Sequence, residues 1–121
     1  MPAGAGKLPA DLRYCGVNIT PICIKALYDI PAATLKDSTN VMGLYESGDV
    51  YSQEDLNLFF ASYAPNVPQG THPKLDSIDG GQAPEPVTSE YVTGESDIDM
   101  DLAYSLIYVS SQASPHLYDA D

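Results

Sequence analysis

The sequence predicts an α/β layer structure with parallel strands and a large share of loops. Segments with helical spacing of apolar residues alternate with short apolar runs, in the order helix, strand, helix, loop, helix, strand. Ten prolines and nine glycines among 121 residues supply more turns than an ideal helical bundle would carry. At 44% hydrophobic content, a chain of this length can bury the core of one domain.

The first expected helix follows an arm, 1–13, that is rich in glycine, alanine and proline. Thr20 is a suitable N-cap and Pro21 suits the first helical position, where a missing amide hydrogen costs nothing. Pro31 ends the segment, because proline cannot continue a helix. We therefore divide the chain into 1–39, an arm with a short helix, and 40–121.

The middle of the chain predicts a strand, a helix and a long loop. The run Asn40–Gly48, NVMGLYESG, is apolar and bounded by polar turns, which is typical of a buried strand. Ser52 then provides an N-cap for a second helix, with acidic residues in the first turn. The proline- and glycine-rich segment 64–90 is expected to be loop, with a short strand near Lys74–Ile78.

The stretch GESDIDMDLAYSLIY predicts a third helix, which begins after Thr93-Gly94, followed by a strand at Ser105–Ser111. Acidic residues are favoured near a helix N-terminus by the helix dipole. Glu95 and Asp99, four positions apart, would lie side by side next to an apolar stripe of Ile98, Leu102 and Leu106. Two such carboxylates cannot both ionise cheaply, so one of the pair is expected to have a raised pKa.

This pattern alone leaves two interpretations of the acidic stretch open, a solvated helix start and a catalytic pair. A calcium loop that begins at Asp97 is disfavoured, since it requires glycine and glutamate where the chain has Leu102 and Tyr108. Tyr104 and Tyr108 are expected to pack in the core. No metal site is predicted, because neither histidine is spaced from a cysteine as zinc ligands are.

The charge of the chain restricts its partners. The formal net charge is -12, and no Lys or Arg follows Lys74, so binding to nucleic acid or to an anionic membrane surface is not expected.

No apolar run approaches the roughly 18 to 20 residues that span a bilayer. The opening segment resembles no secretion signal, so we expect either an intracellular protein or one whose leader has been removed.

Two cysteines, Cys15 and Cys23, flank the glycosylation sequon Asn18-Ile19-Thr20. They can be buried thiols beside a chance sequon. Alternatively, they can form a disulfide in a secreted protein whose Asn18 carries a glycan.

Several segments in the right order resemble the sedolisins, or serine-carboxyl peptidases, especially secreted fungal members and tripeptidyl peptidases. CGVNITPICIKALYDIP resembles the family segment with the same cysteine spacing and Thr-Pro step. NVMGLYESGDVYSQEDLNLFF resembles its first core strand and the helix that follows, and PQGTHP resembles a Pro-x-Gly-Thr-x-Pro loop. GESDIDMDLA then falls where the family has Gly-Glu-x-x-Leu-Asp-x-x-x-Ala, so the likeness runs from about Cys15 to Tyr118.

The resemblance implies a partial subtilisin-like α/β fold, with 40–121 as the amino-terminal portion of a catalytic domain, and a Ser-Glu-Asp triad that cleaves peptides or proteins. Glu95 would be the general base and Asp99 the carboxylate that polarises it. The nucleophilic serine would lie in a Gly-Thr-Ser motif outside this sequence, on a complementing carboxy-terminal polypeptide, so the chain alone is expected to be inactive. Asp97 departs from the family pattern, where a small or polar residue is common.

The resemblance also implies secretion into acidic surroundings, a Cys15–Cys23 disulfide and a glycan on Asn18. No cofactor is expected within this chain, and calcium is expected in the complete family fold. The alternative function is that of a truncated, non-catalytic relative whose acidic face binds a cationic partner.

Overall fold

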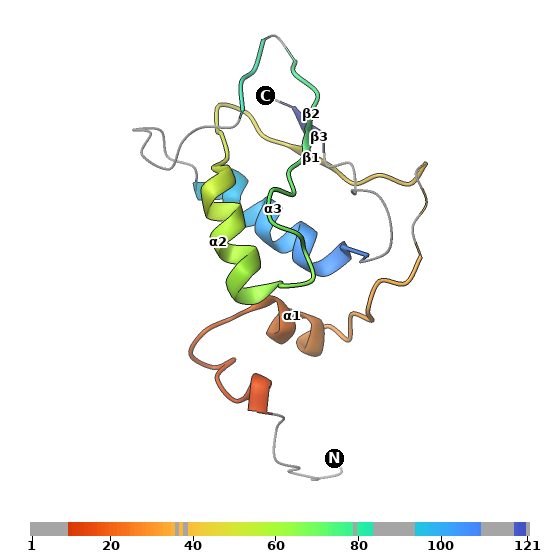
Figure 1. The fold of residues 1–121 in the computed structure, drawn as a ribbon, viewed down its shortest axis with the longest axis vertical. Helices are drawn as coiled ribbons and strands as arrows, with labels where there is room; N and C mark the ends of the chain where they lie inside the picture. The colour runs from red at the N-terminus through yellow and green to blue at the C-terminus, as the bar shows by residue number, and fades with distance from the viewer. Residues whose placement is uncertain are drawn as a thin grey trace.

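The computed structural model describes residues 10–35, 37, 39–78, 80–83, 94–109 and 118–120. Its elements, in chain order, are the 3-10 helix η1 (Ala10–Leu12), α1 (Pro21–Leu27), β1 (Gly43–Tyr45), α2 (Gln53–Tyr63), β2 (Lys74–Leu75), α3 (Gly94–Ile107) and β3 (Tyr118–Ala120). Figure 1 shows α2 beside α3, with α1 at one end of this pair and the three strands above it.

Helix α1 begins where local chemistry predicts, but it ends at Leu27, before the predicted stop at Pro31. Thr20 is extended and Pro21 occupies the first turn. Beyond the helix, Asp29 has a φ of 52°, a left-handed conformation that aspartate tolerates better than most residues. Before α1, η1 places one turn of 3-10 helix inside the expected arm, so that prediction is wrong for these three residues, while 1–9 lie outside the described part of the chain.

Helix α2 confirms the second predicted helix. The Ser52 hydroxyl accepts a hydrogen bond from the Asp55 amide at 3.3 Å, which satisfies one of the free N–H groups of the first turn. Leu56 and Phe60, four positions apart, are both fully buried, while Leu58 on the opposite face is 66% exposed. The helix therefore presents one apolar face to the core.

The outer face of α2 holds the loop that follows it. The Asn57 side-chain oxygen accepts hydrogen bonds from the Gln53 amide group at 3.2 Å and from the Gly70 backbone N–H at 2.8 Å. The Gln53 amide group also donates to the Thr71 carbonyl at 3.0 Å. Gly70 has a φ of 80°, which only glycine adopts without strain. These bonds bring the Gly-Thr turn of the loop back onto the helix.

The three strands form a parallel sheet in the order β1-β3-β2. Gly43 pairs with Tyr118, and Lys74 pairs with the same residue from the other side. The predicted strands near β1 and β2 are confirmed in position, but β1 is not buried: Tyr45 is 71% exposed and Leu44 only half-buried. A short apolar run in the sequence does not by itself show whether a strand is buried or has one face open to solvent.

The predicted strand at Ser105–Ser111 is wrong where the structure describes it. Helix α3 continues through Ile107, and Ser110 and Ser111 lie outside the described residues. The third strand lies instead at Tyr118–Ala120, which the sequence did not indicate. Helix α3 extends because Tyr104 is fully buried against Phe60, and this tertiary contact overrides the local β preference of the segment.

The core lies between α2 and α3. It is formed by buried side chains from both helices and from the loops around them: Tyr51, Leu56, Phe60, Ala64, Val67, Met100, Ala103 and Tyr104. The rings of Phe60 and Tyr104 meet edge to face, with centroids 5.7 Å apart. Tyr104 and the half-buried Tyr108 both join this cluster, which confirms the predicted packing role of the two tyrosines.

Candidate functional site

Glu95 and Asp99 lie on the first two turns of α3. Glu95 is exposed and Asp99 is half-buried, and both side chains extend from a helix whose N-terminus favours negative charge. The predicted helical placement of the pair is therefore confirmed. Their assignment as general base and polarising carboxylate stays a prediction.

The start of α3 is held by a carboxylate from a distant loop. Asp49 accepts a hydrogen bond from the Ser96 backbone N–H at 3.0 Å and another from Val50 at 2.9 Å. Burial acts to raise the pKa of Asp49, but the hydrogen bonds from the Ser96 and Val50 amides outweigh it and keep the pKa below its ordinary value. A side chain 47 positions away thus caps the helix that carries Glu95.

Asp97 makes the opposite connection, from α3 to the start of α2. It is only 8% exposed, and its Oδ1 accepts a hydrogen bond from the Ser52 backbone N–H at 2.7 Å. In the sequence, Asp97 is a departure from the family pattern, which commonly has a small or polar residue at this position. In the structure Asp97 is a buried junction between two helices, a role that no local signal could have indicated.

The predicted apolar stripe on α3 is wrong in its orientation. Ile98 is 53% exposed, and Leu102 and Leu106 are only half-buried. The buried face is instead formed by Ser96, Asp97, Met100, Ala103, Tyr104 and Ser105. The helix is rotated in this way because the hydrogen bond from Asp97 and the packing of Tyr104 on Phe60 both require that face.

The carboxyl group with a raised pKa in this helix is that of Asp101. Burial, followed by the negative charges of Asp97 and Asp55, raises the pKa of Asp101 from 3.8 to about 7. Its buried Oδ1 has no hydrogen-bond partner among the residues that the structure describes. The raised pKa of Asp101 was not predicted, and its first cause is burial and not a carboxylate of the predicted pair.

Asp101→Asn is expected to remove a pH dependence of stability. The folded chain keeps a proton on Asp101 up to about pH 7, whereas the unfolded chain releases it near pH 3.8, so stability falls as pH rises between these values. Because the side chain is partly exposed, we expect the variant to be more stable than wild type by on the order of 1–2 kcal/mol at pH 8, and unchanged at pH 3.

Thermal unfolding from pH 3 to pH 8 measures this effect. The matched control is Asp76→Asn, which alters an exposed aspartate of the loop after β2 and is expected to keep the wild-type pH profile. An Asp101→Asn profile parallel to that of the wild type would contradict the prediction.

The two cysteines form a disulfide, with a sequence separation of 8 and Cα atoms 5.6 Å apart. It joins the segment after η1 to α1.

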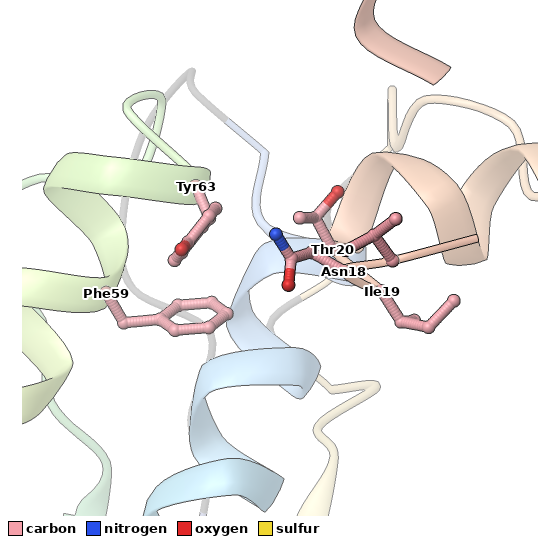
Figure 2. Close-up of a pocket in the computed structure, with 6 residues that line it drawn as sticks. Asn18, Ile19, Thr20, Phe59 and Tyr63 are labelled. Carbon is pink, nitrogen blue, oxygen red and sulfur yellow. The ribbon is translucent and has the colours of Figure 1, made fainter. Parts of the chain in front are cut away.

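The exposed Asn18 between the cysteines lines an open pocket of about 330 Å³. Figure 2 shows Asn18 facing Phe59 and Tyr63 across this pocket, and these two rings are 5.1 Å apart. The predicted attachment of a glycan to Asn18 stays a prediction.

Within the described ranges, no group of three or more His, Cys, Asp or Glu side chains is arranged to hold a metal ion. None of the helices in those ranges has both the length and the apolar content that crossing a bilayer requires.

Comparison with known proteins identifies relatives for most of this sequence. The chain is 50% identical over 103 residues, 84% of its length, to tripeptidyl-peptidase sed1 of Aspergillus fumigatus. It is 50% identical over 102 residues to aorsin of Aspergillus oryzae, and 38% identical over 103 residues to tripeptidyl-peptidase SED1 of Arthroderma otae. The matched part of the chain belongs to the sedolisin family.

The sedolisin relatives are much longer than this chain. It spans 16% of the first relative and 15% of each of the other two. The match to the first relative covers 84% of the 121 residues, so the matched span includes Glu95 and Asp99 wherever it begins. No protein-family model matches the chain, and no solved structure matches it. The subtilisin-like architecture expected of a sedolisin is therefore kept as a prediction.

Proposed function

We propose that this chain is the amino-terminal segment of the catalytic domain of an acid-acting serine-carboxyl peptidase, to which it supplies Glu95 and Asp99. The observation that carries the proposal is the identity of half the matched residues with tripeptidyl-peptidase sed1, over a span that contains both acids. The exposure of Glu95 supports it, since a general base must be accessible to the nucleophile and substrate.

The proposed chemistry is acyl transfer through a serine on polypeptide outside this sequence. The serine hydroxyl gives its proton to the Glu95 carboxylate as its oxygen attacks the peptide carbonyl carbon. When the tetrahedral intermediate collapses, the C–N bond breaks and Glu95 returns the proton to the leaving amine. Water then hydrolyses the acyl-enzyme, with Glu95 again accepting and returning a proton.

Asp99 is proposed to act through Glu95. One helical turn further along α3, its carboxyl group can share a hydrogen bond with the Glu95 carboxyl group and hold it in one orientation. A carboxylate base also operates at lower pH than imidazole does, because its pKa is closer to an acidic working pH.

The proposed setting is extracellular. The Cys15–Cys23 disulfide supports an oxidising compartment, in which Asn18 would be accessible to glycosylation. Calcium is proposed only for the complete fold. The acidic residues of α3 do not fit a calcium cage, because the Asp97 carboxylate accepts the Ser52 backbone N–H instead.

The test is a peptidase assay of the native protein purified from its source, with native and denaturing mass spectra of the same sample. We expect a polypeptide, or a pair of polypeptides, well above 13.0 kDa that carries a Gly-Thr-Ser motif and cleaves peptides in acid. A monodisperse, inactive species of 13.0 kDa that binds a cationic partner would overturn the proposal in favour of an acidic interaction module.

A further inference from the structure

Two aspartates connect the starts of α2 and α3 in opposite directions. Asp49, in the loop before α2, accepts the Ser96 backbone N–H of α3 at 3.0 Å. Asp97, in the first turn of α3, accepts the Ser52 backbone N–H just before α2 at 2.7 Å. The contacts join residues 47 and 45 positions apart, so each helix start is capped by a carboxylate from the other segment.

Both contacts place a negatively charged carboxylate at the start of a helix. The first N–H groups of a helix have no partner within the helix, and a carboxylate satisfies them while interacting favourably with the helix dipole. Ser52 is fully buried and Asp97 nearly so, which shields the bond between them from competing water, whereas the bond from Ser96 to Asp49 is only part-buried. The Asp49 carboxylate lies also toward the Glu95 amide, whose hydrogen bond contributes to the lowered pKa of Asp49.

We propose that Asp49 and Asp97 are positioning residues that together fix the backbone of the first turn of α3, and with it the carboxylate of Glu95. This inference rests on the proposed function of Glu95 as general base. The Glu95 side chain is exposed, so its placement depends on the backbone that carries it. Helix ends fray unless they are capped, and a misplacement of about 1 Å in a catalytic group can lower the rate by roughly 100-fold.

The experiment compares steady-state kinetics of the complete peptidase with Asp49→Ala, Asp49→Asn and Asp97→Ala. Asp49→Ala is expected to lower kcat by about 10- to 100-fold, with KM changed by less than about 2-fold. The Asp49 carboxylate uses one oxygen for the Ser96 amide and the other for the Val50 amide, whereas asparagine has a single, uncharged acceptor oxygen, so Asp49→Asn should hold the Ser96 amide more weakly and recover only part of this loss. The double variant should lose less than the product of the single losses, because both residues hold one junction.

Asp37→Ala is the matched control. Asp37 also accepts a local backbone N–H, from Thr39 at 2.8 Å, but it is exposed and remote in sequence from both helix starts. We expect this variant to keep wild-type kinetics. Enzyme concentrations are normalised by active-site titration, so that a smaller folded fraction does not lower the measured kcat.

The outcomes separate this inference from the proposed function. If Glu95→Gln keeps full activity, the proposed function fails. If Glu95→Gln abolishes activity but Asp49→Ala keeps wild-type kcat, the positioning role is overturned. It is also overturned if the loss of kcat in the double variant equals the product of the losses in the Asp49 and Asp97 single variants.

Amide hydrogen exchange provides a second measurement should Asp49→Ala not fold. In the Asp49→Asn variant, exchange at Ser96 is expected to be faster than in wild type, while exchange at the core residue Phe60 stays the same. Unchanged protection at Ser96 would also overturn the inference.

Discussion

Glu95→Gln in the complete peptidase is expected to lower kcat/KM by about 10⁴-fold or more. Glutamine is nearly isosteric with glutamate, and Glu95 is exposed at the start of α3, so the fold should not change. What is lost is the group that accepts the serine proton during attack and returns it to the leaving amine. Asp99→Asn is expected to cause a smaller loss, since Asp99 acts only through Glu95.

Glu54→Gln is the matched control for this prediction. Glu54 is likewise an exposed glutamate in the first turn of a helix, α2, and its replacement makes the same chemical change. We expect Glu54→Gln to keep wild-type kcat/KM at the pH optimum. Equal losses in the two variants would indicate that charge near the helix starts, and not a specific base, accounts for the effect.

The elements that sequence reasoning predicted well are those whose signals are local. Pro21 begins α1 because its fixed φ suits the first helical turn and it has no N–H group to leave unpaired, and the Ser52 hydroxyl caps α2 by accepting the Asp55 N–H. Leu56 and Phe60 lie four positions apart and therefore share one face of α2, which is the buried face. Such signals need no knowledge of the rest of the fold.

The burial of the acids on α3 could not be predicted from their spacing. Glu95 and Asp97 are both acidic residues of the first turn, yet one is exposed and the other is 8% exposed. The difference depends on the Ser52 amide, which lies 45 positions earlier and offers Asp97 a hydrogen bond. A pattern of residues can indicate that a helix has two faces, but only the contacts of one face decide which is buried.

The third strand of the sheet also depends on contacts between residues that are far apart in the sequence. β3 is three residues long and pairs with β1 through Gly43 and Tyr118, which are far apart in the sequence. A strand this short carries too little periodicity to be recognised, and its existence depends on both neighbours, β1 and β2, being in place. Fold prediction was therefore limited by long-range pairing and not by the composition of the chain.

Phe60→Ala is expected to lower the free energy of unfolding of the 121-residue chain by about 3–5 kcal/mol. Phe60 is fully buried, and its ring meets Tyr104 edge to face at 5.7 Å, so the change leaves a cavity between α2 and α3. It also removes an aromatic pair worth about 0.5–1.5 kcal/mol beyond burial. Since domains are stable by only about 5–15 kcal/mol, a large part of the stability should be lost.

Leu58→Ala on the same helix provides the comparison for the Phe60 variant. Leu58 is 66% exposed, so its replacement should change the free energy of unfolding by no more than about 0.5 kcal/mol. Urea unfolding followed by circular dichroism measures both variants against wild type. Equal effects of the two substitutions would contradict the α2–α3 core, because only a packed interface distinguishes these faces of α2. A large loss at Phe60 alone would show that the helix carrying Glu95 is anchored through Tyr104 to α2.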